Sequence, residues 1–455
     1  MSASGKTVAE TLAARSVALR AEEIPANVRE RCTDLLIDIA GLCVAARNRD
    51  YVVSLKRSLD RSGDCTAIGH AETWSAEDAA LLNGTAAHGE DFDDTFEGGP
   101  VHSGAVVVPA VLAACERFGR GGAAALLGIA AGVETLCRLS LVAPKRIHNA
   151  GFHPTAVLGA IAAALAVSKS IGSSEKQTVD ALGIAGSMAG GIIEYLAEGA
   201  WTKRLHAGWA AHCGLHAARL AHAGFVGPRT VLEGTHGLFF AFAHDRAGDF
   251  EALTGRFGEH WHLAALTFKP YATGTMNQPY IDCALRLARR GFGAEDVAEV
   301  LCETAEGYVK RLWEPLSAKQ RPPNGYAAKF STPFNVAVAF VTGAAGYEAF
   351  SDASVHDPRV LGLARKVRYV IDPDNPYPRA YTGHVRMTLK DGSVHEERQP
   401  HIRGGVHEPL SRADLRHKFM GNTRYGGWPD SLATQFLDFA EHAFDATPDL
   451  AAFRR

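Results

Sequence analysis

The sequence lacks the features that mark several large classes of protein. Its eight cysteines stand singly, with no CxxC pair, so neither a zinc site nor a disulfide framework is indicated. Its 47 basic and 50 acidic residues nearly balance, which gives no electrostatic reason to expect nucleic acid or an anionic membrane as a partner. Its apolar runs are too short, or too rich in alanine and glycine, to predict a membrane span. The composition is that of an ordinary globular protein.

The first 23 residues also lack the uninterrupted apolar segment of a signal peptide. Acidic residues interrupt them, so we expect a first helix and a cytoplasmic protein. Cysteines that neither pair nor bind metal suit a reducing compartment, where they serve as small core residues. A chain of 455 residues is too long for one compact core, so we expect two domains.

Helical spacing dominates from about residue 8 to residue 265. In the segment 28–46 the apolar residues recur along one stripe, at Cys32, Leu35, Leu36, Ile39 and Cys43. Three further segments are poor in charge and rich in alanine and glycine, which predicts helices that are buried on several faces: 126–139, 155–168 and 179–195. This part of the chain is predicted to be a helical bundle.

The pattern changes past the middle of the chain. The segments 297–304 and 367–371 alternate between apolar and polar residues, as half-buried strands do, and 383–396 is predicted to be a hairpin with Lys-Asp-Gly at its turn. After residue 409 the helical pattern returns. We predict a mainly α fold, with a large all-α helical domain built from both chain ends (1–266 with 401–455) and a smaller α+β domain (267–400).

The acidic run HGEDFDDTFEGGPVH, residues 88–102, is the first candidate for chemistry. Asp91, Asp93 and Asp94 follow a predicted helix, where three carboxylates repel one another and meet the negative end of the helix dipole. This cost indicates either that cations lie nearby or that the acids are used. A solvated loop, a divalent metal site and the acidic motif of helical terpene cyclases are the alternatives, of which the sparse aromatic residues disfavour the last.

His153 immediately precedes an alanine-rich predicted helix in GFHPT, residues 151–155. A helix N-terminus favours a bound anion and lowers the pKa of an imidazole placed there. A neutral imidazole can take a proton from carbon. The alternative is a histidine that only caps the helix.

Two basic segments complete the set of candidates. In WTKRLH, Lys203 and His206 precede a small-residue helix that is predicted to be buried, so at least one of them should point inward. In FKPY, Lys269 and Tyr271 fall where the pattern changes, which is a favoured place for a small-ligand site, although the segment also suits an ordinary linker. These cations suit an organic anion better than a divalent ion, so we expect no metal.

Six motifs in this order resemble the MmgE/PrpD family: NGTAAHGEDFDDT, VHSGAVVVPA, GFHPTAVLGAIAAA, TKRLHAGWAA, FKPYATGTMNQPYIDCA and AKFSTPFNVAVAF. That family includes 2-methylcitrate dehydratase, cis-aconitate decarboxylase and iminodisuccinate epimerase. The resemblance implies a small carboxylate substrate, a lid formed by the α+β domain, a pocket between the domains, a homodimer and no cofactor. By motif match, the residues that line the pocket are Asp91, Thr95, His102, His153, Lys203 and Lys269.

The chemistry implied by the resemblance is proton abstraction from a carbon beside a carboxylate. Such a step develops negative charge, which we expect Lys203 and Lys269 to stabilise. His153 or Asp91 is the candidate base.

In a dehydration His102, oriented by Asp91 or Asp93, would protonate the leaving hydroxyl. We assign substrate binding to Thr95, His206 and Tyr271 together with Lys269.

The predicted activity is that of a hydro-lyase, like the 2-methylcitrate dehydratase of propionate catabolism. An epimerase of a dicarboxylate is the second choice, a cis-aconitate decarboxylase the third, and a non-catalytic ligand-binding protein the last. One departure argues against simply transferring the decarboxylase activity: where decarboxylase-like members have a histidine, five residues after the position of Lys269, this chain has Gly274. Another is Ser103, where several relatives have proline.

Overall fold

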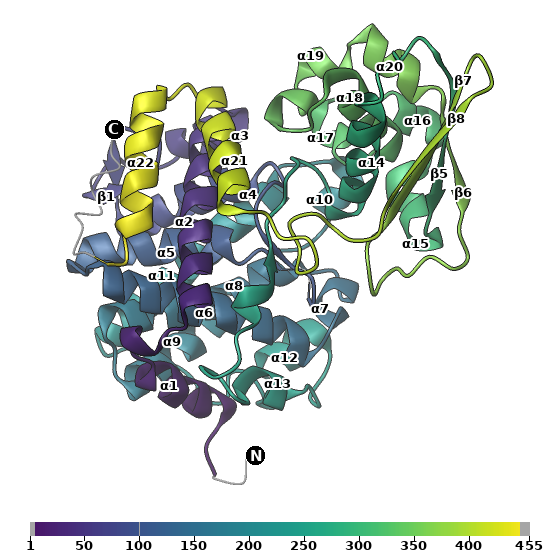
Figure 1. Cartoon of the computed structure of the whole chain (residues 1–455). Helices are drawn as coiled ribbons and strands as arrows, with labels where there is room; N and C mark the ends of the chain where they lie inside the picture. The colour runs from purple at the N-terminus through teal and green to yellow at the C-terminus, as the bar shows by residue number, and fades with distance from the viewer. Residues whose placement is uncertain (1–4, 100, 446–455) are drawn as a thin grey trace. The chain divides into compact units, whose positions relative to one another are not determined.

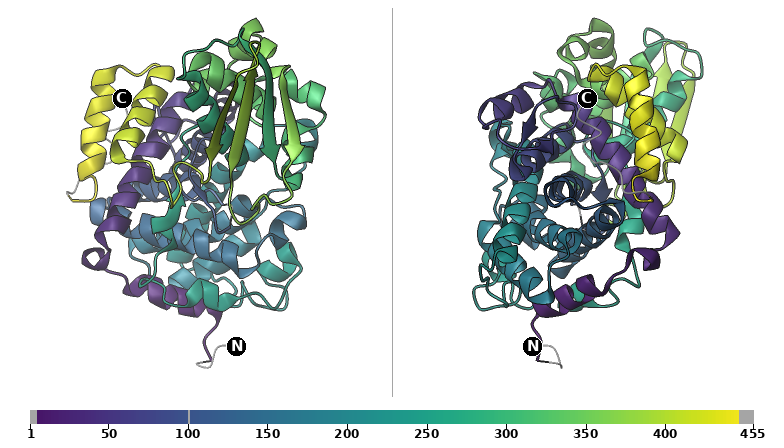
Figure 2. Two further views of the ribbon diagram at one scale, coloured as in Figure 1. Left: turned by 45° about the vertical axis from the view of Figure 1, so that its right-hand side comes forward. Right: turned by 90° about the vertical axis from the view of Figure 1, so that its left-hand side faces the viewer.

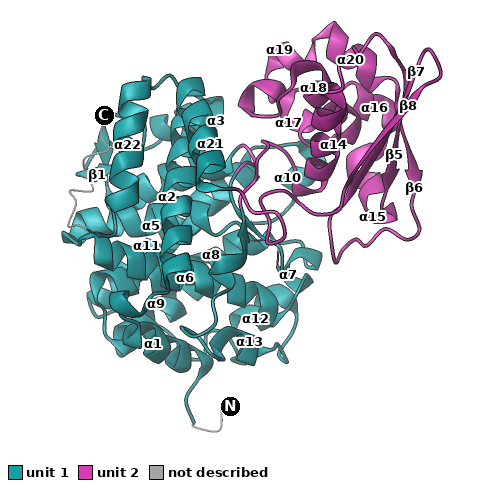
Figure 3. Ribbon diagram, in the orientation of Figure 1, with its two compact units in different colours: residues 1–89, 93–267, 411–455 teal, residues 90–92, 268–410 magenta. Residues whose placement is uncertain are grey.

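The computed structural model describes residues 5–99 and 101–445, which form two compact units (Figure 3). Unit 1 contains the chain up to residue 89, residues 93–267 and the chain from residue 411, and unit 2 contains residues 90–92 and 268–410. The mainly α fold with an α+β part is confirmed. The segments 90–92 and 401–410 lie in unit 2, whereas the sequence pattern placed both in the helical domain.

Unit 1 is built from helices and a few very short strands (Figure 1). Its helices of a full turn or more are α1 (Val8–Ala18), α2 (Ala26–Ala46), α3 (Asp50–Arg57), α4 (Ala76–His88), α5 (Gly104–Phe118), α6 (Gly122–Val142), α7 (Arg146–Asn149), α8 (Pro154–Ile171), α9 (Glu175–Met188), α10 (Tyr195–Glu198), α11 (Thr202–His222), α12 (Leu238–Ala243), α13 (Phe250–Thr254), α21 (Arg412–Tyr425) and α22 (Asp430–His442). The strand pairs are β1 (Cys65–Thr66) with β2 (Thr73–Trp74) and β3 (Thr95–Phe96) with β4 (Leu266–Thr267).

The core of unit 1 lies around α8, which packs against α5, α6, α9 and α11. Both α6 and α8 are long and apolar enough to cross a membrane, but 89% of the apolar window of each is buried inside the protein. Their alanines and glycines allow close packing: a Cβ at Gly159 of α8 would lie 3.1 Å from the Cβ of Ala210 in α11. The composition that resembles a membrane span therefore serves a tightly packed core.

Segments from the early and late parts of the sequence lie side by side in unit 1, where α21 and α22 pack beside α2 (Figures 1 and 2). A capping box of Ser411 and Asp414 begins α21. From α21, Lys418 forms an ion pair with Asp38 of α2 at 2.7 Å, and both side chains are buried. The C-terminal segment is thus an integral part of the helical bundle.

The helices α4 and α11 cross at very close range. A Cβ at Gly84 would lie 2.6 Å from the Cα of Gly208, so the two backbones touch where only glycine fits. Because the crossing lies one turn before the end of α4 and less than two turns after the start of α11, the C-terminus of α4 is brought beside the N-terminus of α11.

The helix predicted over 179–195 is wrong in its second half. The helix α9 ends at Met188, and Gly190 and Gly191 follow. The C-cap residue Ala189 is already extended, and Gly191, with φ +133, lies in the non-helical segment that follows. This segment pairs with residues 151–153: the amide of His153 donates to the carbonyl of Gly191 at 2.8 Å, and the amide of Ile193 donates to the carbonyl of Gly151 at 3.0 Å.

Unit 2 contains a four-stranded sheet in the order β6-β5-β7-β8, in which β5 and β6 are parallel and the other neighbours antiparallel (Figure 2). The strands are β5 (Val297–Thr304), β6 (Val367–Ile371), β7 (Gly383–Leu389) and β8 (Val394–Gln399), and the helices are α14 (Gln278–Ala288), α15 (Glu306–Tyr308), α16 (Leu316–Gln320), α17 (Gly325–Ala328), α18 (Thr332–Thr342), α19 (Asp352–Val355) and α20 (Pro358–Ala364). The helices α14 and α18 pack on each other, α14 also on β7 and β8, and α18 also on β6. The predicted strands and hairpin are confirmed.

Candidate active site

Four histidines of unit 1 form the centre of the candidate site. We call His88, His102, His153 and His206 the histidine cluster. The ring centroid of His88 lies 4.9 Å from that of His102 and 5.6 Å from that of His153, and the rings of His153 and His206 are 5.2 Å apart. His88, His153 and His206 are buried, and His102 is partly buried.

Helix ends supply three of the four rings. His88 is the last residue of α4, and His206 lies in the second turn of α11, so the close crossing of these helices brings both to one place. His153 is the N-cap residue of α8, where Pro154 fixes the first helical position. The side chain of His153 accepts no capping hydrogen bond, which removes the interpretation as a mere helix cap.

His153 and His206 contact each other through their Nδ1 atoms at 3.1 Å. Burial, followed by the charges of His88, Lys203 and His206, holds the pKa of His153 well below its ordinary value. Burial, followed by the charges of His88 and Lys203, lowers the pKa of His206 to about 4. Both rings are therefore neutral at pH 7. In a neutral pair one Nδ1 donates and the other accepts, so the donor ring has a basic Nε2.

Lys203 lies in the first turn of α11, and its side chain is largely buried. Its charge contributes to the lowered pKa of both His153 and His206. The prediction that Lys203 or His206 points inward therefore holds for both side chains. The positive charge of Lys203 thus lies near two neutral imidazoles, His153 and His206.

His88 and Asp93 form a buried pair, in which Nδ1 of His88 donates to Oδ2 of Asp93 at 2.7 Å. The other carboxylate oxygen of Asp93 lies 3.6 Å from Nδ1 of His102. His88, Asp93 and His102 offer ligand atoms that lie within 4.8 Å of one another, so this trio is the group through which a metal would bind if the site took one. The 2.7 Å contact is a hydrogen-bond length, which suits a proton between the two groups better than a shared metal ion.

A main-chain carbonyl and a hydroxyl contact Nδ1 of His102. Its Nδ1 donates to the carbonyl of Asp94 at 2.7 Å, and the hydroxyl of Thr95 lies 3.3 Å from the same nitrogen. The predicted orientation of His102 by Asp91 or Asp93 stays a prediction; Oδ1 of Asp93 lies 3.6 Å from the same nitrogen, farther than the carbonyl of Asp94. With Nδ1 protonated, Nε2 of His102 is the atom available for proton transfer.

Asp94 holds the loop in place. Its two carboxylate oxygens accept from the amides of Ser103 at 3.0 Å and Gly104 at 2.9 Å, at the start of α5. Burial and the nearby charges of Asp93 and Asp38 raise the pKa of Asp94 to about 8, against the effect of the two amides. Its position at a helix N-terminus makes it a structural residue.

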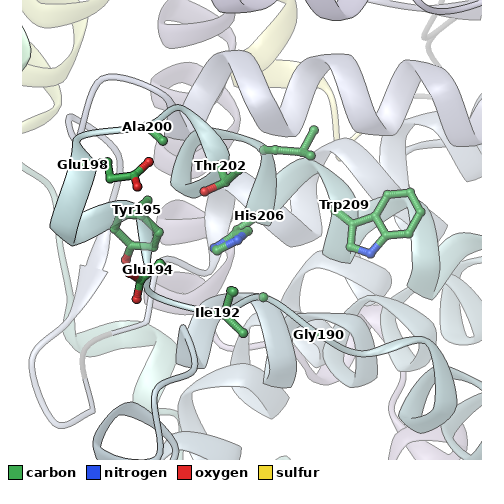
Figure 4. A pocket seen from close by; sticks show the side chains of 11 residues that line it. Gly190, Ile192, Glu194, Tyr195, Glu198, Ala200, Thr202, His206 and Trp209 are labelled. Atoms are coloured by element: carbon green, nitrogen blue, oxygen red, sulfur yellow. The ribbon is translucent and has the colours of Figure 1, made fainter.

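A cavity of about 650 Å³ in unit 1 reaches the histidine cluster at His206 (Figure 4). In that view Glu194 and Glu198 lie on one side of His206 and Trp209 on the other. The wall of the cavity is formed by the segment that begins at Gly190 and by the first turns of α11. His206 is thus the member of the cluster that both lines a cavity and contacts His153.

The remaining candidates, Asp91, Lys269 and Tyr271, belong to unit 2. Nζ of Lys269, a buried side chain, donates to the carbonyl of Asp91 at 3.0 Å. Asp91 has φ +56, a left-handed conformation that costs a residue other than glycine about 1–2 kcal/mol. The hydroxyl of Tyr271 donates to Asp282 of α14 at 2.5 Å, and its substrate-binding role stays a prediction.

Sequence reasoning missed His88 and Lys329. His88 opens the acidic run and stands five residues before its partner Asp93, but only the end of α4 brings the two together. Lys329 stands in AKFSTPF and forms a buried ion pair with Glu90 at 2.8 Å in unit 2. A signal existed for each: both are ionisable residues within apolar or small-residue surroundings.

Comparison with known proteins gives consistent matches. Residues 10–251 match the MmgE/PrpD N-terminal domain, and residues 271–431 match the MmgE/PrpD C-terminal domain. Cis-aconitate decarboxylase of Aspergillus terreus is 29% identical over 430 residues, which cover 88% of this chain and 86% of the relative. The cis-aconitate decarboxylases of Mus musculus and Homo sapiens are 30% and 31% identical and cover 76% of this chain, and the alignments cover 71% and 72% of those relatives. Of the candidate residues, Lys269 alone falls between the two matched domains.

Proposed function

Because the chain belongs to the MmgE/PrpD family, we propose that it is a cofactor-independent lyase that acts on a small di- or tricarboxylate. The observation that carries the proposal is the pair of buried, neutral imidazoles, His153 and His206, held Nδ1 to Nδ1 beside the ammonium of Lys203. A base that is neutral at pH 7 is what abstraction of a proton from carbon requires.

The proposed first step forms a carbanion. Nε2 of His153 takes the proton from the carbon beside a substrate carboxylate, and the electron pair of the broken C–H bond moves onto that carboxylate. Lys203 stabilises the charge that develops there, and this stabilisation is larger in a buried site than in water. Lys269 and Asp91 are the proposed contributions of unit 2, as a second cation and a second proton-transfer group.

The proposed second step is loss of water. The electron pair returns to form a carbon–carbon double bond, and the adjacent hydroxyl leaves with a proton from Nε2 of His102. The carboxylate of Asp93, 3.6 Å from Nδ1 of that ring, supports the positive charge that His102 carries before it donates. This is the hydro-lyase activity: the hydroxyl leaves as water with the proton from His102, and the proton that His153 took from carbon passes to His102 through solvent before the next turnover.

Decarboxylation is the second candidate, and the names of the relatives favour it. In that reaction the bond to a carboxylate breaks, CO₂ leaves, and the carbanion takes a proton from the site. Gly274, where decarboxylase-like members have a histidine, removes one proton donor that such a reaction would use. Epimerisation is the third candidate and needs only return of the proton to the opposite face of the same carbon.

One experiment separates these reactions. The purified protein is incubated in deuterated water with 2-methylcitrate, citrate, cis-aconitate and a chiral amino- or hydroxy-dicarboxylate, and the products are followed by NMR and CO₂ release. Formation of an alkene without CO₂ release supports the hydro-lyase. Release of CO₂ would contradict it and identify a decarboxylase. Deuterium uptake with loss of optical activity and no alkene identifies an epimerase. Binding without turnover of any compound would leave the ligand-binding alternative.

A homodimer is also proposed, as the family resemblance implies. Four large apolar side chains between residues 192 and 209 are between 42% and 60% exposed: Ile192 and Trp209, which line the cavity, and Leu196 and Trp201, which are neighbours in sequence of residues that do. We propose that a second copy of the chain covers these side chains, and their exposure in a single copy supports this proposal. Light scattering should then give twice 48.5 kDa, and a mass of one chain at micromolar concentration would overturn it.

A further inference from the structure

We infer that Lys329 is a positioning residue that holds Asp91 in place for the reaction. This inference rests on the proposed function, because it assumes that Asp91 takes part in the chemistry. Lys329 itself is fully buried at the end of α17, and it acts through Glu90, the residue that precedes Asp91.

The ammonium of Lys329 makes two contacts with one residue. Its Nζ donates to the carbonyl oxygen of Glu90 at 2.6 Å and lies 2.8 Å from the carboxylate of the same residue. The rings of Tyr347 and Phe350 flank it, with Nζ 5.6 and 5.5 Å from their centroids. Such aromatic faces favour a cation and keep it from turning elsewhere. Main chain and side chain of Glu90 are therefore fixed together.

Each residue of the tripeptide 90–92 is anchored to unit 2 by a different group. Glu90 is held by Lys329, the carbonyl of Asp91 is held by Lys269, and the ring of Phe92 lies 5.6 Å from the ring of Tyr347. Between these anchors Asp91 adopts its left-handed conformation. A strained residue persists only where its surroundings determine it, and here the two neighbouring anchors do so.

The main-chain carbonyl of Lys329 also binds a second segment of unit 2. Its carbonyl accepts from the hydroxyl of Thr273 at 2.6 Å, from the amide of Gly274 at 3.2 Å and from the side chain of Asn277 at 3.0 Å. One residue thus joins the segment that carries Asp91 to the segment that follows Lys269 and Tyr271.

A purely stabilising role does not account for this arrangement. Taking two charges out of water is expensive, and a buried ion pair is often no more stable than an apolar pair of the same volume. The contact to the main-chain carbonyl adds geometry: it fixes the peptide that enters Asp91. The functional consequence is that the main chain at Asp91 is held in one conformation.

The test compares four variants by steady-state kinetics and thermal melting. We expect Lys329→Met to lower kcat about 10- to 100-fold with KM within about threefold, because the reacting group and not the binding surface is displaced. Lys329→Arg should recover part of kcat. Glu90→Gln should lose less than Lys329→Met, because the contact to the carbonyl remains. The double variant Lys329→Met/Glu90→Gln removes both buried charges and should regain melting temperature without regaining kcat.

The matched control is a second buried lysine pair, Lys418 with Asp38, which joins helices that carry no candidate residue. Lys418→Met should lower the melting temperature and leave kcat unchanged. A loss of kcat in this control equal to that of Lys329→Met would overturn the inference, because any buried lysine would then have the same effect.

Coupling to Asp91 distinguishes positioning from a general loss of structure. If Lys329 acts through Asp91, the loss of kcat in Asp91→Asn/Lys329→Met should be close to that of Asp91→Asn alone. Losses that multiply overturn the inference and leave the proposed function standing. Full turnover by Asp91→Asn alone would instead remove Asp91 from the proposed chemistry, and the inference with it. Crystal structures of wild type and Lys329→Met should show the 90–92 backbone moved in the variant, and an unmoved backbone also overturns the inference.

Discussion

The ionisable groups of the two units are arranged for different purposes. In unit 1 the rings of the histidine cluster contact one another. His153 and His206 contact each other through their Nδ1 atoms, and an imidazole nitrogen can either donate or accept a proton. In unit 2 Lys269 and Lys329 donate to main-chain carbonyls of residues 91 and 90. The comparison indicates that unit 1 is organised to change protonation state and unit 2 to fix backbone geometry.

The charges around the ionisable groups also differ between the two units. Burial and positive neighbours lower the pKa of His153 and His206, so the protein without substrate holds two neutral imidazoles beside Lys203. A bound carboxylate adds negative charge and raises those pKa values again. The acid limb of kcat should therefore lie at higher pH than that of kcat/KM, since the former reports the substrate complex. In unit 2 Glu90 already pairs with the buried ammonium of Lys329.

The largest effect is expected where unit 1 supplies the base. His153→Ala should lower kcat about 10²- to 10⁴-fold, the usual contribution of one general base, because His206 alone lacks the partner that fixes its tautomer. Steady-state turnover of the substrate found by NMR measures it, with circular dichroism to show that the fold persists. The exposed His236→Gln is the matched control and should turn over like wild type. Normal turnover by His153→Ala would place the base elsewhere and remove the contrast between the two units.

A smaller effect is expected for the fixed charge of unit 1. Lys203→Met should lower kcat/KM about 10- to 100-fold, since a hydrogen bond to a charged group contributes about 1.5–3 kcal/mol. The same change removes a positive charge that lowers the pKa of His153 and His206, so both pKa values should rise. The acid limb of the pH–rate profile, where the neutral base becomes protonated, should accordingly move to higher pH. An acid limb that stays in place would show that Lys203 does not act on the base.

The next prediction concerns the segment that carries the cavity wall. Gly191→Ala should destabilise the protein by about 1–3 kcal/mol, because φ is +133 and a Cβ would lie 2.6 Å from the Cβ of Ala156. Urea unfolding measures the loss. Gly190→Ala is the control, since nothing lies within 4 Å of a Cβ there, and its effect should stay within about 0.5 kcal/mol. Equal stabilities of the two variants would show that the pairing with residues 151–153 is loose.

The fold was largely predictable because its signals are local. The alternation of residue types in Val297–Thr304 and Val367–Ile371 predicts two strands with the boundaries that the structure has, since this alternation can be read from each segment alone. The helix predicted over 179–195 ends at Met188, because the residues that follow pair with residues 151–153, a contact between distant segments that the local pattern does not contain.

The candidate site was predictable only in part, for a physical reason. His153, Lys203 and His206 stand at helix starts, where sequence shows both the helix and the chemical group. The roles of His88 and Lys329 depend on which segments meet in space: the first on the crossing at Gly84 and Gly208, the second on contacts between residues 239 positions apart. Spacing along the chain carries no information about such contacts.

The smallest effect on activity is expected for Tyr271→Phe in unit 2. If polar groups there hold geometry, kcat should stay unchanged and stability should fall by about 1–3 kcal/mol, because a buried acceptor loses its donor. Asp282, that acceptor, has a pKa raised to about 6 by burial, and the hydrogen bond from Tyr271 lowers it. Below that pH Asp282 is protonated and neutral, so loss of the Tyr271 hydroxyl costs little stability. Above that pH Asp282 is a buried carboxylate, and the variant leaves it without that hydrogen-bond donor. The stability difference between variant and wild type should thus be larger at pH 8 than at pH 5 in urea unfolding. A fall in kcat with unchanged stability would instead support the substrate-binding role that the sequence predicted, and would show that unit 2 also supplies groups to the substrate.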